Sequence, residues 1–190
     1  MEVYLVRHTE TVCEKGICYG QSDVGIREPY SAVFENILKQ LPQEAVLYSS
    51  PLQRCAILAN HIKENTQIDS IIEDSRLMEM HFGDWELKRW EQIDQNALDE
   101  WMRNAVNLQC PNGESYTDLF NRTTAFFDEI ASKNHKTVVI VTHASVIRCL
   151  LMYVLAITFE KSFDIRIAYG SVSKFTIEDG SIGVDFINRI

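Results

Sequence analysis

The chain has 190 residues, of which 46% are hydrophobic and 24% are charged, and its formal net charge is −9. This length favours a single domain, and the acidic charge argues against nucleic acid or a membrane surface as a partner, because both attract basic proteins. No apolar run reaches the ~20 residues of a membrane span, and no secretory leader precedes the first predicted strand. We therefore expect a cytoplasmic protein.

The spacing of cysteines and histidines bears on metals and cofactors. The five cysteines are odd in number and form no CxxC pair, so we expect reduced thiols and neither disulfides nor a zinc site. No HxH, HxxxH or HExxH spacing occurs, and the phosphate-binding patterns GxGxxG and GxxxxGK[ST] are missing. Neither a metal nor an organic cofactor is therefore expected.

In the first half of the chain, the pattern of apolar residues predicts strands that alternate with helices. Ser50, Pro51 and Gln53 carry the signature of a capping box, which predicts the start of the second helix. The predicted elements are a buried strand over 3–6, a turn-rich loop over 9–27, a helix over about 30–40, a strand over 45–50 and a helix after Ser50.

The second half continues this alternation. Ser115 and Asp118 form a second capping box, and the sequence EDGS predicts a hairpin turn between the last two strands. The predicted elements are a short strand and an extended stretch within 69–86, a helix over about 90–106, a helix after Ser115, a strand over 137–142, a helix over about 145–156, and strands over about 172–177 and 182–187.

Strands that alternate with helices and read as continuous apolar runs predict an α/β fold. We expect a three-layer α/β/α sandwich with a mainly parallel central sheet and antiparallel strands at the C-terminus. Residues 1–190 would form one domain, with a helical cap inserted at about 84–115. In open sheets of this kind, ligands bind outside the carboxyl ends of the strands.

Two histidines are predicted at those ends. His8 follows the run EVYLVR, and His143 follows KTVVIVT. The helix after His143 would direct unpaired N–H groups and the positive end of its dipole toward an anion. Taken alone, His8 is as compatible with a structural role at the edge of the core as with catalysis, whereas for His143 alone the structural role is favoured.

Two arginines and one glutamate accompany them. Arg7 lies at the end of a buried strand and needs either an anionic ligand or an acidic side chain such as Glu10. Arg54 lies in the first turn of its helix, where a cation is unfavourable unless an anion is near or the side chain is simply solvated. Glu79 alternates with apolar neighbours, so it would share a face with His81 and project into a cleft as a general acid.

Together these side chains favour phosphoryl transfer. Two guanidinium groups and one imidazole can hold phosphate oxygens, a second imidazole can attack phosphorus, and a carboxyl group can move the protons. Fixed cations can replace a metal ion in such a reaction.

The motifs that carry these residues resemble the histidine phosphatase superfamily, in its phosphoglycerate-mutase-like branch. They are VRHTET, GQSD, YSSPLQRC, LMEMHFGDWE, PNGES and VTHAS, and they occur in the order of that family over most of the chain. The resemblance implies a metal-independent phosphomonoesterase with a phosphoglycerate-mutase-like fold.

The resemblance also assigns roles. It implies that His8 is the nucleophile that becomes phosphohistidine, and that Arg7, Arg54 and His143 hold the phosphoryl group. Glu79 would protonate the leaving alcohol and then activate water. The matching motifs add three substrate contacts, Gly20, Gln21 and Ala144. We expect the second ring nitrogen of His8 to donate to a backbone carbonyl.

Three departures from the family pattern involve four positions. Thr9 replaces the usual glycine after the nucleophile, Ala144 and Ser145 replace small residues that are often glycines, and Glu14 replaces an asparagine that often touches phosphate. The departures at Thr9 and Glu14 are the only support for a different class of function, a non-catalytic phosphate-binding module.

The choice of substrate stays open between related esters. The phrases CYGQSDVGI, MEMHFGDWE and PNGES look most like α-ribazole phosphatases, which implies hydrolysis of α-ribazole 5′-phosphate in cobalamin biosynthesis. The alternative is a broad-specificity phosphatase or a phosphoglycerate mutase-like enzyme on another ester. The expected partner is thus a small phosphate ester, and the oligomeric state, with a homodimer as one option, is left open.

Overall fold

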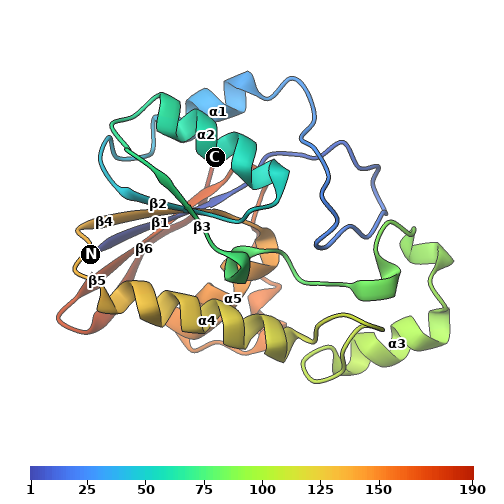
Figure 1. The fold of residues 1–190 in the computed structure, drawn as a ribbon. Coiled ribbons are helices and arrows are strands. Elements are labelled where there is room, and N and C mark those ends of the chain that lie inside the picture. Colours follow the sequence, from blue (N-terminus) through green and yellow to red (C-terminus); the bar gives the residue numbers. More distant parts are fainter.

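The computed structural model describes residues 1–190 and contains one central sheet, in the strand order β3-β2-β4-β1-β5-β6 (Figure 1). The first four strands run parallel, and the last two are antiparallel. The strands are β1 (Glu2–Arg7), β2 (Val46–Ser49), β3 (Ile71–Glu73), β4 (Thr137–Thr142), β5 (Val172–Glu178) and β6 (Ser181–Arg189).

Helices cover both faces of this sheet, so the predicted three-layer α/β/α sandwich is confirmed. Figure 1 shows α1 and α2 on one face and α4 and α5 on the other. The helices are α1 (Ser31–Leu38), α2 (Gln53–Glu64), α3 (Gln95–Asn104), α4 (Tyr116–Ser132), α5 (Ala144–Leu155) and α6 (Phe159–Ser162), with short 3-10 turns η1 (Ser75–Leu77), η2 (Gly83–Trp85) and η3 (Trp90–Gln92). None of the helices combines the length and hydrophobicity that crossing a bilayer requires.

The central strand β4 is buried on both faces of the sheet, which explains its uninterrupted apolar sequence. Val138 and Ile140 belong to the core cluster on one face of the sheet, and Val139 and Val141 belong to the cluster on the other face. All four side chains are fully buried. Successive side chains of a strand point to opposite faces, so a strand covered on both sides is apolar at every position.

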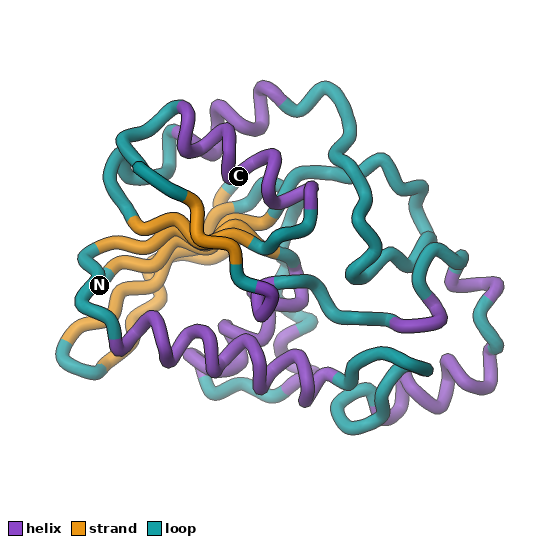
Figure 2. The backbone as a smooth tube through the Cα atoms, viewed as in Figure 1, coloured by secondary structure: helices purple, strands orange, loops and turns teal.

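The register of β1 and β4 brings the two predicted histidines together. Arg7 pairs with Thr142, and the amide of His8 donates to the carbonyl of Thr142 over 3.1 Å. His8 and His143 therefore leave adjacent strands at the same edge. Figure 2 shows the long loops gathered at this end of the sheet.

The prediction of a capping box at the start of α2 is wrong. The helix begins at Gln53, and its N-cap is Leu52, which has no side-chain cap. The Gln53 main-chain amide instead donates to the Asp23 carboxylate over 2.7 Å, and its side-chain amide donates to the carbonyl of Asp23 over 2.9 Å. The Ser50 hydroxyl bonds to His143. Contacts with distant residues thus replace the local cap. The second box, in which Ser115 and Asp118 cap α4, is confirmed.

The helix predicted over about 90–106 is divided in two. A 3-10 turn, η3, ends at Gln92, and α3 begins at Gln95 after Asp94, whose side chain accepts the amide of Ala97 over 2.9 Å. Asp94 acts as an N-cap and stops the earlier turn from continuing into α3. The remaining predicted elements are found within a few residues of their expected bounds.

Candidate active site

His8 follows the carboxyl end of β1 as a buried residue whose ring is fixed by the main chain. Its Nδ1 lies 2.7 Å from the carbonyl oxygen of Thr9, and because a carbonyl only accepts, Nδ1 carries the proton. The expected donation to a backbone carbonyl is thus confirmed. Burial, and then the charges of Arg54 and Arg7, hold the pKa of His8 well below its ordinary value. The imidazole is neutral, and its Nε2 keeps a free lone pair.

His143 is the N-cap of α5 and is completely buried. Its Nδ1 accepts a hydrogen bond from Nε of Arg54 over 3.2 Å. Its Nε2, the protonated nitrogen of the neutral ring, then donates to the Ser50 hydroxyl over 2.8 Å. Burial, followed by the proximity of the His8 ring and the charge of Arg54, lowers the pKa of His143. The ring centroids of His143 and His8 are 5.1 Å apart, so the predicted meeting of the two histidines is confirmed.

Arg54 is fully buried in the first turn of α2 and does not face solvent. Its two terminal nitrogens donate to the carbonyls of Ser22 at 2.9 Å and Gly20 at 2.5 Å. Together with the bond to His143, these contacts use three of its five N–H donors. Its other two N–H groups have no hydrogen-bond partner within the protein. The carbonyl oxygens compensate a cation that the helix terminus alone would disfavour.

Arg7 does not form the ion pair that the sequence left open. Glu10 lies 3.8 Å from Arg27 instead, and Arg7 donates to the carbonyl of Ile167 over 2.5 Å. The guanidinium carbon of Arg7 lies 3.8 Å above the ring of Tyr169, and its buried Nε has no hydrogen-bond partner. Arg7 therefore brings positive charge that no carboxylate neutralises.

Glu79 lies in the extended segment after η1, and both its main chain and its side chain are held. Its carboxylate accepts the amides of Met80 at 2.9 Å and of Ser145 at 3.4 Å. Its carbonyl accepts the side chains of Gln21 at 3.0 Å and Arg122 at 2.9 Å. Bonds from the loop before α1, from α4 and from α5 thus fix the position of this carboxylate.

The loop that contains Gly20 and Gln21 is anchored by a glutamate that the sequence analysis did not select. Glu86 has only 10% of its side chain exposed. It accepts the amide of Gln21 at 2.8 Å and both the amide and the hydroxyl of Ser22 at 2.5 Å. A Cβ at Gly20 would lie 2.5 Å from the carbonyl oxygen of Met80, so only glycine fits. The loop can therefore present its carbonyls to Arg54.

These elements surround a cavity of about 180 Å³, which we call the catalytic cavity. Its lining consists of Arg7, His8, Ile17, Cys18, Tyr19, Gly20, Glu79, Phe82, Trp90 and Ser145. Four of the predicted residues, Arg7, His8, Gly20 and Glu79, thus share one cavity. Arg54, His143 and Gln21 are not part of its lining, but the ring of His143 lies 5.1 Å from that of His8 and bonds to Arg54. Ala144 does not line the cavity, but its neighbour Ser145 does.

The residues that depart from the family pattern have separate surroundings. Glu14 pairs with Arg89, and 73% of its side chain is exposed, so it does not face the catalytic cavity. Thr9 is buried, and its hydroxyl has no partner. His81, which was expected beside Glu79, has 42% of its side chain exposed and lies outside the cavity lining.

Two charged side chains that position the site were not predicted from the sequence, Glu86 and Arg122. The guanidinium of Arg122 donates to three carbonyls and to one carboxylate, those of Arg76, Met78, Glu79 and Glu114. A charged residue within a helix or a turn has the sequence pattern of a solvated surface residue, so only long-range packing could reveal these roles.

The tryptophans of the segment 84–115 divide into two groups. Trp85 and Trp101 are buried and belong to the larger core cluster. Trp90 is half-buried and lines the catalytic cavity. This segment therefore combines a structural role with contact to the site.

The chain matches known proteins over nearly its whole length. The model of the family described as "Histidine phosphatase superfamily (branch 1)" matches residues 3–190. Phosphoserine phosphatase 1 of Hydrogenobacter thermophilus is 26% identical over 186 residues, which cover 94% of this chain and 88% of the relative. The adenosylcobalamin/alpha-ribazole phosphatase of Salmonella typhimurium is 25% identical over 196 residues, which cover 99% and 96%.

Solved structures agree with this match at the level of the fold. The alpha-ribazole phosphatase of Shigella flexneri superposes with a TM-score of 0.90 and covers 100% of this chain and 96% of its own, at 21% identity. Bacillus stearothermophilus YhfR superposes with a TM-score of 0.86 at 27% identity, covering 97% and 95%.

Proposed function

The chain belongs to branch 1 of the histidine phosphatase superfamily and is an enzyme of the phosphatase type, and we propose that it hydrolyses phosphate monoesters through a phosphohistidine on His8, without a metal. The tautomer of His8 carries this proposal. Because Nδ1 is engaged with the carbonyl of Thr9, the lone pair of Nε2 is free to attack phosphorus. Arg7 and Glu79 line the same cavity.

In the first step, Nε2 of His8 bonds to phosphorus while the bond from phosphorus to the ester oxygen breaks. Protonated Glu79 gives its proton to the leaving alcohol. In the second step, the Glu79 carboxylate takes a proton from water as the water oxygen attacks phosphorus and the P–N bond breaks. Phosphate leaves, and His8 is neutral again.

The positive charge for both steps comes from arginine and imidazole donors. Arg7 lacks a carboxylate partner, and Arg54 keeps two N–H donors for phosphoryl oxygens. His143 offers its Nε2 proton, now bonded to Ser50. Fixed donors of this kind stabilise the charge that develops in phosphoryl transfer.

For the substrate we propose α-ribazole 5′-phosphate, which would be hydrolysed to α-ribazole and phosphate in cobalamin biosynthesis. The motif phrases of the chain and the name of the Salmonella relative support this choice. So do the apolar side chains beside His8, namely those of Ile17, Phe82 and Trp90, which suit a leaving alcohol with an apolar, flat part.

A second candidate is a phosphatase of another ester, of broad or different specificity. The relatives named as phosphoserine phosphatases favour it. The non-catalytic module is disfavoured by the surroundings of Glu14, which is exposed and paired with Arg89 and so leaves the catalytic cavity unaffected.

A cytoplasmic location and a cap formed by residues 84–115 also belong to this proposal. All five cysteines are free, as is usual in a reducing compartment. The cap would cover the catalytic cavity through Phe82, which immediately precedes it, and Trp90.

The test of the proposal is turnover of p-nitrophenyl phosphate in excess chelator, followed by a phosphomonoester panel ranked by kcat/KM. The substitution His8→Ala should lower kcat by on the order of 10³ or more and abolish acid-labile labelling of the protein by a radioactive phosphate donor. His135→Ala is the matched control, because His135 precedes β4 at the opposite end of the sheet. Activity of His8→Ala near that of the parent would refute the mechanism.

A further inference from the structure

A second cavity, which we call the aromatic groove, lies between α3 and α6 and measures about 720 Å³. Six aromatic side chains form most of its wall. They are Phe82, Trp90, Trp101, Tyr116, Phe159 and Phe163. Residues that line this groove but not the catalytic cavity take no part in the reaction steps proposed above.

The aromatic groove adjoins the catalytic cavity. Phe82 and Trp90 contribute to the lining of both, and their rings meet edge to face at a centroid distance of 5.5 Å. These two rings therefore separate the two cavities, and an ester whose phosphoryl group lies at His8 would have to extend its alcohol part past them to reach the aromatic groove.

The walls of the aromatic groove favour a flat apolar group. The ring of Tyr116 lies 4.5 Å from that of Phe159, which lies 4.9 Å from that of Phe163, both as edge-to-face pairs. Half of Phe163 is exposed, so a ligand can cover its free surface. Large aromatic faces of this kind gain most from stacking against another ring.

Charge in the aromatic groove disfavours an anionic alcohol part. Its lining includes the carboxylates of Asp99 and Glu160 and no lysine or arginine. Arg148 lies outside the lining and packs its guanidinium carbon 4.5 Å from the ring of Phe163. A carboxylate on the ligand would meet like charge in the groove, whereas a neutral group would not.

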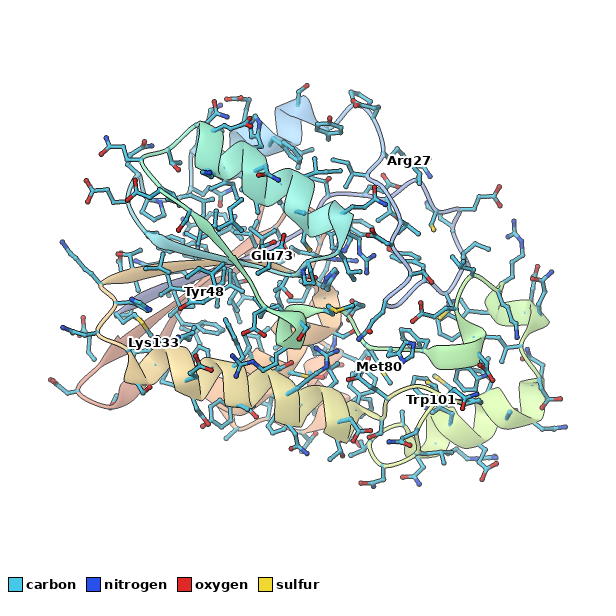
Figure 3. All side chains as sticks on the ribbon, in the orientation of Figure 1. Arg27, Tyr48, Glu73, Met80, Trp101 and Lys133 are labelled. Carbon is cyan, nitrogen blue, oxygen red and sulfur yellow. The ribbon has the colours of Figure 1, made fainter.

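One polar group in the wall lacks a partner. The indole of Trp101, which α3 contributes (Figure 3), is buried, and its Nε1 has no hydrogen-bond acceptor within the protein. A buried donor without an acceptor is unfavourable, so such groups usually find one. Because Nε1 itself is covered, a ring nitrogen or oxygen of a ligand in the aromatic groove would accept this hydrogen bond once the side chains over Nε1 move aside.

We propose that the aromatic groove binds the alcohol part of the substrate and selects a flat, uncharged heteroaromatic group with a hydrogen-bond acceptor for Trp101. This inference rests on the proposed phosphatase function and extends it to the class of leaving group. It favours nucleoside-like esters over esters whose alcohol carries a carboxylate.

The test compares four esters on variants of the aromatic groove. The esters are 1-naphthyl phosphate, quinolin-5-yl phosphate as its nitrogen-containing counterpart, glycerol 2-phosphate and O-phosphoserine. The substitution Phe163→Ala should lower kcat/KM for the two aromatic esters by about tenfold and leave glycerol 2-phosphate unchanged. Leu155→Ala is the matched control, since Leu155 is similarly exposed but lies outside the groove.

The substitution Trp101→Phe keeps a ring and removes the N–H group. It should reduce kcat/KM for quinolin-5-yl phosphate by about five- to tenfold more than for 1-naphthyl phosphate. Each variant is compared with the parent on the same ester, so the intrinsic reactivity of the leaving group cancels.

Two results would overturn the proposal. One is an equal effect of Phe163→Ala on all four esters, or no effect on any. The other is a parent preference for O-phosphoserine that Arg148→Ala removes, because the site would then recognise a carboxylate. Calorimetric binding of 1-naphthyl phosphate to His8→Ala, with and without Phe163→Ala, tests the groove without turnover and so separates its failure from failure of the proposed phosphatase.

Discussion

The hydrogen bond from Nε of Arg54 to Nδ1 of His143, 3.2 Å long, links a permanent cation to a neutral imidazole. Because Arg54 can only donate, His143 must carry its proton on Nε2. The same guanidinium holds the carbonyls of Gly20 and Ser22. One buried side chain therefore sets a tautomer, a loop conformation and the positive field around His8.

Replacing Arg54 tests this linkage. We expect Arg54→Ala to lower kcat by on the order of 10²–10³, as does loss of one preorganised donor in other enzymes. Arg54→Lys should recover little of this loss, because an ammonium group cannot make the same three divergent bonds. Steady-state kinetics with p-nitrophenyl phosphate measures both effects.

Arg103→Ala supplies the control for charge, because Arg103 is an exposed residue of α3 outside both cavities. A kcat for Arg54→Ala within about threefold of the parent would show that Arg54 contributes no donor to the transition state.

Stability should fall in mild acid because of the two buried histidines. Burial is the main cause that lowers the pKa of both His8 and His143 below the ordinary 6.5. The unfolded chain thus binds protons on these rings at a higher pH than the native state does. Their contribution to stability is complete above pH 6.5 and is lost as the pH falls below it.

Urea denaturation at pH 7.5 and at pH 5.5 measures this effect. Each histidine should lower the free energy of unfolding by up to about 1.4 kcal/mol for each pH unit below 6.5. In His8→Ala the dependence on pH should be about half as steep, since one ring remains. An unfolding free energy that is the same at both pH values would show that these rings titrate alike in the folded and unfolded chains.

The elements that the sequence predicted best are those whose pattern depends on burial alone. The strand over 137–142 is found with its predicted bounds, because a strand covered on both faces is apolar throughout. The start of α2 could not be predicted, because Ser50 and Gln53 bond to His143 and Asp23, which are distant in sequence.

Some residues of the site could likewise be predicted from the sequence, and others could not. His8, Arg7 and Glu79 could be predicted, because strand ends and family motifs mark them. Glu86 and Arg122 could not, because their importance comes from carbonyls and amides of other segments. The local sequence pattern indicates which face of a segment is buried. It does not indicate which distant backbone groups a charged side chain will hydrogen-bond.

Glu86 is expected to position the loop of Gly20 and Gln21 without touching the reacting atoms, and its substitution tests this role. Its two carboxylate oxygens accept from the amides of Gln21, Ser22 and Phe82 and from the Ser22 hydroxyl. The side-chain amide that Glu86→Gln introduces has one accepting oxygen in place of two, so some of these hydrogen bonds are lost and the loop should loosen around Arg54. We expect kcat to fall by about tenfold or more with a smaller change in KM.

Glu91→Gln is the control, because Glu91 is exposed on η3. The double substitution with Ser22→Ala should lower kcat by less than the product of the two single effects, since both act on the bond between the Ser22 hydroxyl and Glu86. Fully additive effects on kcat, or a loss only in thermal stability, would mean that Glu86 does not act through this loop.

Gly20 tests how closely the loop must approach the segment that carries Glu79. The Cβ of Gly20→Ala would lie 2.5 Å from the carbonyl oxygen of Met80 and would also clash with the Glu86 carboxylate, so the loop must move and its carbonyl must leave Arg54. We expect kcat to fall by at least about tenfold and the free energy of unfolding to fall by about 1–3 kcal/mol. Gly25→Ala is the matched control, since the nearest atom to its Cβ would lie at an ordinary 3.5 Å. If Gly20→Ala and Gly25→Ala were equally active and equally stable, the loop would tolerate a displaced carbonyl, and Arg54 would not depend on it.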